Sequence, residues 1–419
     1  MIRRPTTILG LLTGLNLLNY IDRYVLSAVL PKIQDALHLS GFIAGSLGTV
    51  FLLGYFITSP FFGSLADRGG RRTWLIAFGI VVWSLATAAS GLAASAGSLV
   101  AARVFVGVGE AAYATIAPTI IDDIAPPERR GKWLAIFYSA IPIGSALGFM
   151  IGGKVESVFG WRAAFFFAGG PGIVLALSCL FVVEPPRVVA KVKVSVVEAF
   201  KTLAPIFHYR RAVLGYCAGT FAVGGFAFWA PTFLYRRYAM PLDKANFMFG
   251  AITVVGGAIG TAIGGWLGDR WTRAAVAKSG ATTPADVDDA FVIANLRVCA
   301  LSAALATPAA IACFVSPTPT VFFVCVFVCE LGLFLSMSPI NAVILRSVPA
   351  ALRAGAMALS IFAIHLLGDL WSPPLTGLLA DHMPIQWAMM ILPVAIAVSG
   401  VVWLVPDVQK RAAGTDRLG

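Results

Sequence analysis

The sequence predicts an all-helical membrane protein with 12 transmembrane helices in two pseudo-symmetric six-helix bundles. Of its 419 residues, 58% are hydrophobic and only 12% are charged, and the mean hydropathy is +0.85, whereas soluble globular chains carry about 25% charged residues. Apolar runs of about 20 residues, enough to cross a hydrocarbon core of about 30 Å, recur between short polar segments. Stretches such as 75–94 are apolar on every face, which excludes a transmembrane barrel of alternating strands.

Proline, glycine and charged residues divide the chain into these expected helices. The N-terminal apolar run continues past Asp22 to Leu30 without a small-residue cleavage site, so we expect it to remain as the first helix. The expected ranges are about 7–30, 41–66, 73–94, 98–122, 132–153 and 162–183 in the first half, and about 211–236, 243–268, 290–314, 319–345, 353–379 and 385–405 in the second.

Basic residues outnumber acidic ones, 31 to 20, which gives a net charge of +11. They are scattered through loops in twos and threes, so they do not predict nucleic-acid binding. If both termini and the even-numbered loops are cytoplasmic, most of the basic residues fall on the inner side, as the positive-inside rule requires. We therefore expect a multi-pass protein of the cell inner membrane with both termini in the cytoplasm.

Residues 63–72, with the sequence Gly-Ser-Leu-Ala-Asp-Arg-Gly-Gly-Arg-Arg, join the second and third expected helices. The small Gly63 permits close helix approach, Asp67 can accept hydrogen bonds, and one of the last two arginines can reach Asp122 or Asp123. Such a cluster can latch one conformation, although an ordinary positive-inside loop is also basic. The segment resembles the signature loop of the major facilitator superfamily, whose fold matches the two predicted bundles.

A weaker copy of this segment, Gly265-Trp-Leu-Gly-Asp269-Arg270, is expected to end the eighth helix, as Gly63 to Arg68 ends the second. The repeat indicates a six-helix unit used twice. We expect an N-terminal bundle over 1–184, a cytoplasmic linker over 185–211 and a C-terminal bundle over 212–419. The predicted gating residues are Asp67, Arg71, Arg72, Asp122, Asp269 and Arg270.

Three segments of the first half carry a narrower resemblance. They are Asn19-Tyr-Ile-Asp22-Arg23-Tyr24, the run 103–122 with Arg103 and Gly107-Val-Gly109-Glu110, and Phe137-Tyr138-Ser-Ala-Ile-Pro142-Ile-Gly144. Together they look like the spinster family of lipid transporters, and the similarity is densest over 16–153. The resemblance implies a proton-linked carrier of lysophospholipid or sphingolipid-like amphiphiles. In such a carrier Asp22 and Glu110 are coupled to protons, and Arg23 lies near the substrate path.

The same Asn-Tyr-x-Asp-Arg pattern also resembles the anion:cation symporter family, in which Arg23 would pair with a substrate carboxylate. The alternative function is therefore a proton-coupled carrier of small organic anions. A lipid carrier should have a fissure that opens sideways to the bilayer, whereas an anion carrier should have a sealed polar cavity with several cations. An uncoupled lipid scramblase and a membrane enzyme are wider alternatives.

Four ionisable residues lie within expected membrane segments of the first half: Asp22, Arg23, Arg103 and Glu110. Inserting such a group costs about 3 kcal/mol, so these residues require one another or water. Arg103 and Glu110 share one face of a helix, and the opposite directions of the two helices place Asp22 within reach of Arg103. A movement that makes or breaks an arginine contact can load and release a proton, whereas a static ion pair would only join the helices.

The second half contributes Glu330, predicted to exchange protons, and the pair His365 and Asp369 on one helical face. A histidine bonded to a carboxylate is also a frequent structural arrangement, so the role of that pair stays open. The aromatic candidates could equally face lipid or pack within a bundle. The predicted substrate-binding residues are Tyr20, Arg23, Arg103, Tyr113, Tyr138, Trp229 and His365.

The sequence contains no ATP-binding loop, catalytic triad or metal-ligand cluster, and Gly107-Val-Gly109 is no dinucleotide motif because no strand precedes it. The six cysteines lie in apolar runs and are predicted to be free thiols. We therefore expect no enzymatic activity, no metal and no cofactor. The expected partners are a lysolipid or similar amphiphile, protons and membrane lipids, and the expected state is a monomer.

Overall fold

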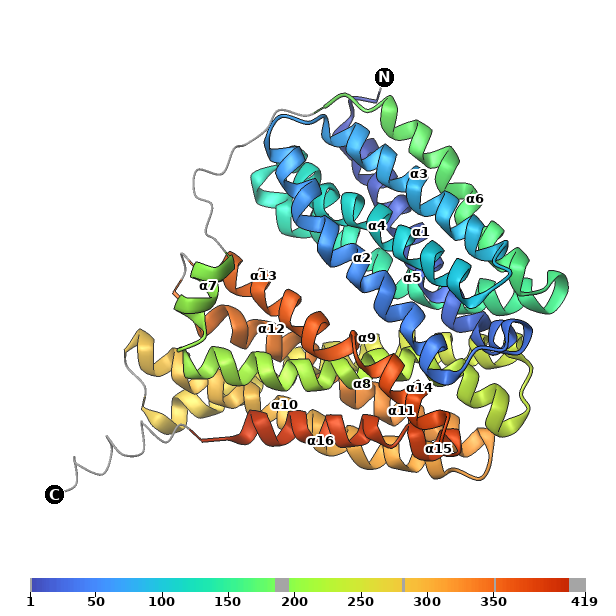
Figure 1. Cartoon of the computed structure of the whole chain (residues 1–419). Helices are drawn as coiled ribbons and strands as arrows, with labels where there is room; N and C mark the ends of the chain where they lie inside the picture. Colours follow the sequence, from blue (N-terminus) through green and yellow to red (C-terminus); the bar gives the residue numbers. More distant parts are fainter. Residues whose placement is uncertain (1, 185–195, 281–282, 350–351, 407–419) are drawn as a thin grey trace. The chain divides into compact units, whose positions relative to one another are not determined.

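The computed structural model describes residues 2–184, 196–280, 283–349 and 352–406, and most of them lie in helices (Figure 1). The first half contains α1 (Pro5–Leu37), α2 (Gly41–Asp67), α3 (Arg72–Gly91), α4 (Ala96–Ile124), η1 (Pro127–Arg129), α5 (Arg130–Phe159) and α6 (Trp161–Leu180). The second contains α7 (Val196–Leu203), α8 (Phe207–Tyr238), α9 (Leu242–Ser279), α10 (Pro284–Val315), α11 (Pro319–Leu335), α12 (Met337–Arg346), α13 (Arg353–Ile364), η3 (His365–Asp369), α14 (Ser372–Ala380), α15 (Ile385–Ala388) and α16 (Ile391–Leu404). The all-helical fold class is confirmed.

Eleven segments of the described chain are long and apolar enough to cross a membrane. The remaining helix of the predicted set is α1, whose 33 residues extend about 50 Å at 1.5 Å per residue. It is less apolar than the others because Asn16, Asn19, Asp22 and Arg23 lie along it, and the first three of these are buried against other helices. The chain is therefore a multi-pass membrane protein, and α1 completes the predicted set of helices.

The eighth predicted helix does not end at the repeated motif. α9 continues through Asp269 and Arg270 to Ser279, because residues 271–278 contain neither glycine nor proline and include several strong helix formers. The next helix, α10, begins at a Thr283 cap whose hydroxyl accepts the Asp286 N–H at 3.2 Å. The expectation that the motif ends this helix, as it ends α2, is therefore wrong.

Three predicted helices of the second half are interrupted. The range 319–345 consists of α11 and α12, 353–379 consists of α13, the π-helical turn η3 and α14, and 385–405 consists of α15 and α16. Pro339, Pro373 and Pro393 lie near these breaks, and a proline removes one backbone hydrogen bond from a helix. Within the predicted linker 185–211 the structure contains α7, and 185–195 lie outside the described residues.

The internal contacts divide the chain into two compact units that do not follow chain order. Unit 1 comprises Met1–Lys191, Ala227–Val254 and Pro373–Ala388, and unit 2 comprises Val192–Phe226, Val255–Ser372 and Met389–Gly419. Unit 1 therefore contains α1 to α6 together with parts of α8, α9 and α14 and all of α15. The predicted bundles 1–184 and 212–419 follow the sequence repeat and stay a prediction.

Glycines set the close packing of the first helices in unit 1. A Cβ atom on Gly144 would lie 2.7 Å from the Leu17 carbonyl oxygen, and one on Gly148 would lie 2.7 Å from that of Ile21, so α5 packs directly on the backbone of α1. Gly107 of α4 lies in the same way against the Phe51 carbonyl of α2. The glycines of α5 therefore form a close-contact surface, and this packing helps to bring the charged residues of α1 and α4 together.

Segments from the second half complete unit 1 at the end where α1 stops and α2 starts. The side-chain amide of Asn246 donates to the Ala28 carbonyl at 3.0 Å, and the Trp229 indole N–H donates to Pro373 at 2.9 Å. The Asp381 carboxylate accepts the first two N–H groups of α2, from Gly41 at 2.5 Å and Phe42 at 2.9 Å. These bonds satisfy donors that a helix start otherwise leaves unpaired.

In unit 2, α10 packs against α11, α12 and α16. A second glycine ridge, on α9, lies against α11: a Cβ on Gly260 would lie 2.5 Å from the Leu331 carbonyl oxygen, and Gly264 packs equally closely on Leu335. The glycines of α9 therefore also form a packing surface. It sets the position of Glu330, whose Cβ would lie 3.3 Å from a Cβ on Gly256.

Candidate functional site

The four predicted ionisable residues of the first half gather within unit 1 and form the charge cluster of Asp22, Arg23, Arg103 and Glu110. An Arg23 guanidinium nitrogen lies 2.6 Å from a Glu110 carboxylate oxygen. Asp22 accepts a hydrogen bond from the Thr87 hydroxyl on α3. These contacts join α1, α3 and α4, but within the cluster only Arg23 and Glu110 form an ion pair among the described residues.

The pairing within the charge cluster differs from the expected one. Asp22 was expected to reach Arg103, yet neither a hydrogen bond nor an ion pair within 4.0 Å joins them in the described structure. The close ion pair is instead Arg23 with Glu110. The sequence could not indicate this pairing, because it depends on the rotation of α1 about its axis against α4.

The charge cluster is almost completely enclosed. The exposed fractions of Asp22, Arg103 and Glu110 are 0%, 1% and 0%, whereas the side chain of Arg23 is 25% exposed. Arg23 is therefore the member that reaches the accessible surface. Because it is also bonded to Glu110, it connects that surface with the buried carboxylate.

Several buried polar atoms of this region have no hydrogen-bond partner in the described part of the chain. They are Asn19 Nδ2, Asp22 Oδ1, Arg23 Nε, Arg103 Nε, Arg103 Nη1 and Glu110 Oε1. Native proteins rarely leave such groups unpaired, because an unpaired buried polar group costs about 1–3 kcal/mol and a charged one more. The cluster therefore retains bonding capacity for water, a proton or a polar group of a substrate.

Aromatic rings fix the two guanidinium groups in place. The Arg23 guanidinium carbon lies 4.8 Å from the ring centres of both Tyr20 and Phe51. The Arg103 guanidinium lies 5.2 Å from the same Phe51 ring. Stacking of this kind contributes about 0.5–2 kcal/mol. The contact between Gly107 and the backbone of Phe51 places this ring over both arginines.

The predicted aromatic residues occupy different environments. Tyr113 is fully buried between Trp83 and Phe137, and its hydroxyl donates to the Leu12 carbonyl. Trp229 is also fully buried, with its indole N–H bonded to Pro373. Tyr138 is 47% exposed, and Tyr20 is half-buried beside Arg23. Of the four, only Tyr20 and Tyr138 therefore present an accessible surface to a ligand.

The candidates of the second half lie in unit 2. Glu330 on α11 is 5% exposed, and the described residues offer its carboxylate neither a hydrogen bond nor an ion pair. A His365 ring nitrogen lies 2.9 Å from an Asp369 carboxylate oxygen, and these two residues are the ends of the π-turn η3. Their side chains are 32% and 21% exposed. π-turns are frequent at functional sites, so this pair stays a candidate.

Of the predicted gating residues of the first half, Arg72, which starts α3, is the centre of an ion-pair network. An Arg72 guanidinium nitrogen lies 2.6 Å from Asp123, and its Nε lies 3.0 Å from Glu184. Asp122 instead lies 3.8 Å from Arg130. We call Arg72, Asp123 and Glu184 the Arg72 network. The partner of Arg72 on α4 is therefore Asp123 rather than Asp122.

Glu184 was not predicted as a site residue. It lies shortly after the end of α6 at Leu180, and its second carboxylate oxygen accepts the Thr73 N–H at 3.3 Å. Burial acts to raise its pKa, but hydrogen bonds from the Arg72 side chain and from the Thr73 and Arg72 N–H groups outweigh this and hold the pKa of Glu184 below its ordinary value. A single acidic residue before Pro185 and Pro186 was the only sequence signal for it.

The other gating candidates are exposed. Asp67 is the last residue of α2, and Arg71 stacks on the Trp74 ring at 5.1 Å. Asp269 and Arg270 lie within α9, where Arg270 stacks on Trp266 at 5.4 Å. In the described chain these two residues form no ion pair. The second copy of the motif therefore lacks the network that the first copy builds.

No group of three or more metal-ligating side chains occurs among the described residues. The cysteines are free thiols, and all but Cys325 are buried. The prediction of free thiols is confirmed. The chemistry of this region is therefore that of carboxylates, guanidinium groups and aromatic rings.

A family model described as Major Facilitator Superfamily matches residues 12–285. The chain is 32% identical over 417 residues to the probable sphingolipid transporter spinster homolog 2 of Arabidopsis thaliana, with 90% of this chain and 82% of that protein covered. It is 32% identical to protein spinster homolog 1 of Homo sapiens, with 92% and 74% covered. It is 31% identical to a sphingosine-1-phosphate transporter of Danio rerio, with 96% and 84% covered.

Solved structures show the same fold. The crystal structure of a bacterial homolog of the human lysosomal transporter Spinster, in an inward-facing and unoccupied conformation, matches with a TM-score of 0.79 at 23% identity, over 96% of this chain and 95% of that chain. A D-xylose-proton symporter matches with a TM-score of 0.73 at 17% identity, over 96% and 98%. Both are similar to this chain in backbone arrangement.

Proposed function

Because the chain belongs to the spinster family of the Major Facilitator Superfamily, we propose that it is a secondary active transporter that moves a lysophospholipid or sphingolipid-like amphiphile by proton-linked alternating access. Two of the relatives named above are described as a probable sphingolipid transporter and a sphingosine-1-phosphate transporter, and these are transporters, not enzymes. The observation that carries the mechanism is the charge cluster, in which the buried Glu110 carboxylate is bonded to Arg23, a partly exposed residue.

The proton step uses the contact between Arg23 and Glu110. When Glu110 is ionised, its 2.6 Å ion pair holds Arg23 inward. Protonation of Glu110 would remove that charge and free Arg23 for an anionic group of the substrate. Asp22, bonded to Thr87 and adjacent in sequence to Arg23, is a second position for a proton. Proton uptake by Glu110 would thus favour substrate binding, because the Glu110 carboxylate and the substrate anion compete for the same guanidinium group.

The substrate surface is proposed to consist of Arg23, Tyr20 and Tyr138. Arg23 supplies a fork of N–H donors that matches a phosphate group, and the two tyrosines supply apolar faces with hydroxyl groups. Tyr113 and Trp229 are omitted because both are fully buried in packing. Arg103 is proposed to balance the negative charge of the buried carboxylates and not to contact the substrate, because it is only 1% exposed. Glu330 and His365 are retained as proton and substrate candidates of the second half.

The Arg72 network is proposed to be a latch between α3, α4 and the segment after α6. A movement that separates these elements must break both carboxylate contacts of Arg72. The even-numbered loops and both termini are proposed to lie on the cytoplasmic side of an inner membrane, which the distribution of basic residues supports. The protein is proposed to act as a monomer, with the bundles 1–184 and 212–419 as the moving bodies.

The test is uptake of a lysophospholipid into proteoliposomes, with and without an imposed pH gradient. The variants are Asp22→Asn and Glu110→Gln, and the control is Asp35→Asn, which neutralises an exposed carboxylate on the same helix as Asp22. We expect the two cluster variants to be folded and to lose the response to the pH gradient, and the control to keep it. Loss of folded protein, or folded variants that keep the response to the pH gradient, would instead mean that the cluster is a static ion pair.

A carrier of small organic anions is the second candidate, because Arg23 and Arg103 bring two guanidinium groups to one region. A competition experiment, in which short-chain dicarboxylate is added during lysophospholipid uptake, distinguishes the two functions. Excess short-chain dicarboxylate should leave lysophospholipid uptake unchanged if the substrate is an amphiphile. Inhibition by the dicarboxylate, together with its own accumulation, would favour the anion carrier.

A further inference from the structure

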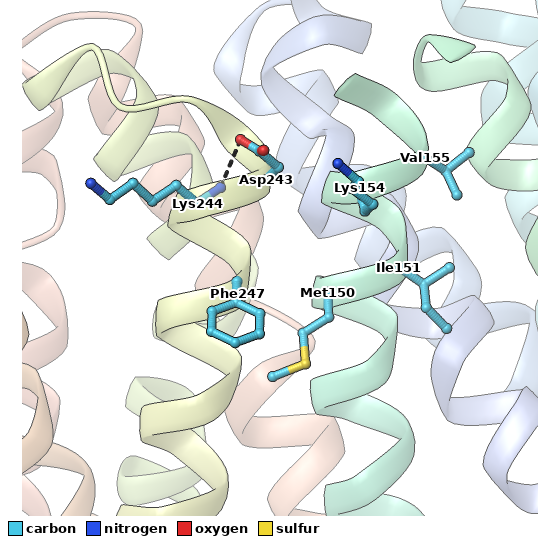
Figure 2. A pocket seen from close by; sticks show the side chains of 7 residues that line it. All are labelled: Met150, Ile151, Lys154, Val155, Asp243, Lys244 and Phe247. Carbon is cyan, nitrogen blue, oxygen red and sulfur yellow. Dashed lines mark hydrogen bonds between the residues drawn. The ribbon is translucent and has the colours of Figure 1, made fainter. Parts of the chain in front are cut away.

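A groove of about 530 Å³ lies in unit 1 between α5 and the first turns of α9. Its walls combine the apolar side chains of Met150, Ile151 and Phe247 with the charged Lys154, Asp243 and Lys244. Figure 2 shows Met150 and Phe247 pointing toward each other from the two helices, with Lys154 and Asp243 above them in the view. The groove is therefore apolar at one end and charged at the other. None of its residues belongs to the charge cluster or the Arg72 network.

The contact between α5 and α9 closes the floor of this groove. A Cβ on Gly153 would lie 2.9 Å from the Leu242 carbonyl oxygen, so the two helices touch through backbone atoms. The buried Asn246 side chain donates to Leu242 at 2.8 Å and to Ala28 of α1 at 3.0 Å. The Phe149 and Phe249 rings pack edge to face at 5.3 Å. The groove is therefore lined by residues of α5 and α9, and none of its lining residues comes from α1.

The charged end of the groove is positive. Lys154 and Lys244 are both exposed, and the described residues offer neither ammonium group a carboxylate within 4.0 Å. The Asp243 carboxylate accepts the Lys244 backbone N–H at 2.8 Å, as the dashed line in Figure 2 shows, so it caps the first turn of α9. The two ammonium groups therefore remain available to an anion.

We propose that this α5–α9 groove binds one phospholipid of the surrounding bilayer. The phosphate would lie between Lys154 and Lys244, and an acyl chain would follow Met150, Ile151 and Phe247. Lysines near the ends of transmembrane helices lie at headgroup level, while Phe247, 58% exposed, lies one helical turn deeper among acyl chains. Two ammonium groups at headgroup level can form charge-assisted hydrogen bonds with a lipid phosphate.

The occupant is a resident lipid and not the transported substrate, because the floor of the groove separates it from the charge cluster. A lipid with its phosphate bonded to both helices would bridge α5 and α9 and stabilise their contact at Gly153 and Asn246. The inference therefore extends beyond the proposed transport function, and failure of either one leaves the other standing.

The test measures thermal unfolding of delipidated protein in detergent during titration with phosphatidylglycerol, and native mass spectrometry counts the bound lipid. The variants are Lys154→Gln, Lys244→Gln and the double variant. Each lysine near the membrane surface contributes about 1 kcal/mol, so we expect about fivefold weaker binding for each single variant and about thirtyfold for the double variant. The control Lys132→Gln removes an exposed lysine at the opposite end of α5, and it should bind normally.

Two comparisons complete the test. Diacylglycerol with the same acyl chains lacks the phosphate and should give no stabilisation, and Phe247→Ala should weaken phosphatidylglycerol binding without abolishing it. Equal stabilisation by diacylglycerol, or unchanged binding by the double lysine variant, would overturn the proposal. So would stabilisation by lysophospholipid alone, because that result would assign the groove to the transported substrate.

Discussion

The two copies of the repeated motif have the same sequence pattern but different surroundings. At the first copy, α2 ends at Asp67, and Arg72, five residues later at the start of α3, bonds to two carboxylates, Asp123 and Glu184. At the second copy, α9 runs straight through Asp269 and Arg270, which remain exposed. The buried acids differ in the same way, since Glu110 has an arginine partner, whereas the described residues provide none for Glu330. A duplicated sequence pattern therefore does not imply duplicated interactions.

The largest expected effect follows from separating the buried ion pair of the first half. Arg23→Met leaves Glu110 charged and buried without its partner, so we expect the free energy of unfolding to fall by about 3 kcal/mol, the lower end of the range for such pairs because Arg23 is partly exposed. Adding Glu110→Gln should restore most of this loss. Thermal unfolding of the two single variants and the double variant measures the coupling, and strictly additive effects would contradict a direct interaction.

The next effect compares the two motif copies. Arg72→Gln removes charged hydrogen bonds to Asp123 and Glu184, so we expect a loss of about 2 kcal/mol in unfolding free energy. Arg270→Gln is the matched control at the second copy and should change stability by less than about 0.5 kcal/mol. Urea denaturation of both variants in the same detergent measures the difference in unfolding free energy. Equal losses at the two positions would show that the copies are equivalent after all.

A pH effect should also distinguish the first copy. Because the folded-state pKa of Glu184 lies below its ordinary value of 4.5, its contribution to stability is present above that value and is lost as the pH falls through the lowered folded-state pKa. The thermal midpoint should therefore decline below about pH 4.5, and Glu184→Gln should flatten part of that decline. An unchanged pH profile in this variant would argue against the hydrogen bonds to Arg72 and Thr73.

The smallest expected change in stability is at Glu330. Glu330→Gln removes no ion pair, so the free energy of unfolding should change by about 0.5 kcal/mol or less, whereas Glu110→Gln leaves Arg23 without its partner. If Glu330 exchanges protons, its neutral variant should still alter the pH dependence of uptake in proteoliposomes. Loss of stability comparable with that of the Glu110 variant would mean that Glu330 has a structural partner.

The helices and the set of charged residues in the site could be predicted from the sequence, but the ion pairs between those residues could not. Apolar length identified the helices, and the insertion cost of charge identified Asp22, Arg23, Arg103 and Glu110 as a set. The rotation of each helix about its axis decides which arginine pairs with which acidic residue. Hydropathy carries no information about this rotation. For the same reason Tyr113 and Trp229 could not be separated from Tyr138, because an aromatic residue in an apolar run fits packing and exposure equally well. The role of Glu184 could not be predicted because its partners Arg72 and Thr73 lie 112 and 111 residues away in the sequence.

The cap that Asp381 provides has a consequence for how the chain is made. Its carboxylate bonds to backbone amides 340 and 339 residues earlier, so the beginning of α2 emerges from the ribosome long before its own cap exists. Those amides must be satisfied by water or lipid headgroups until synthesis is nearly complete. A fragment that stops after α6 would also lack Asn246 and the Trp229–Pro373 bond, and we expect it to mature only when the missing part is co-expressed.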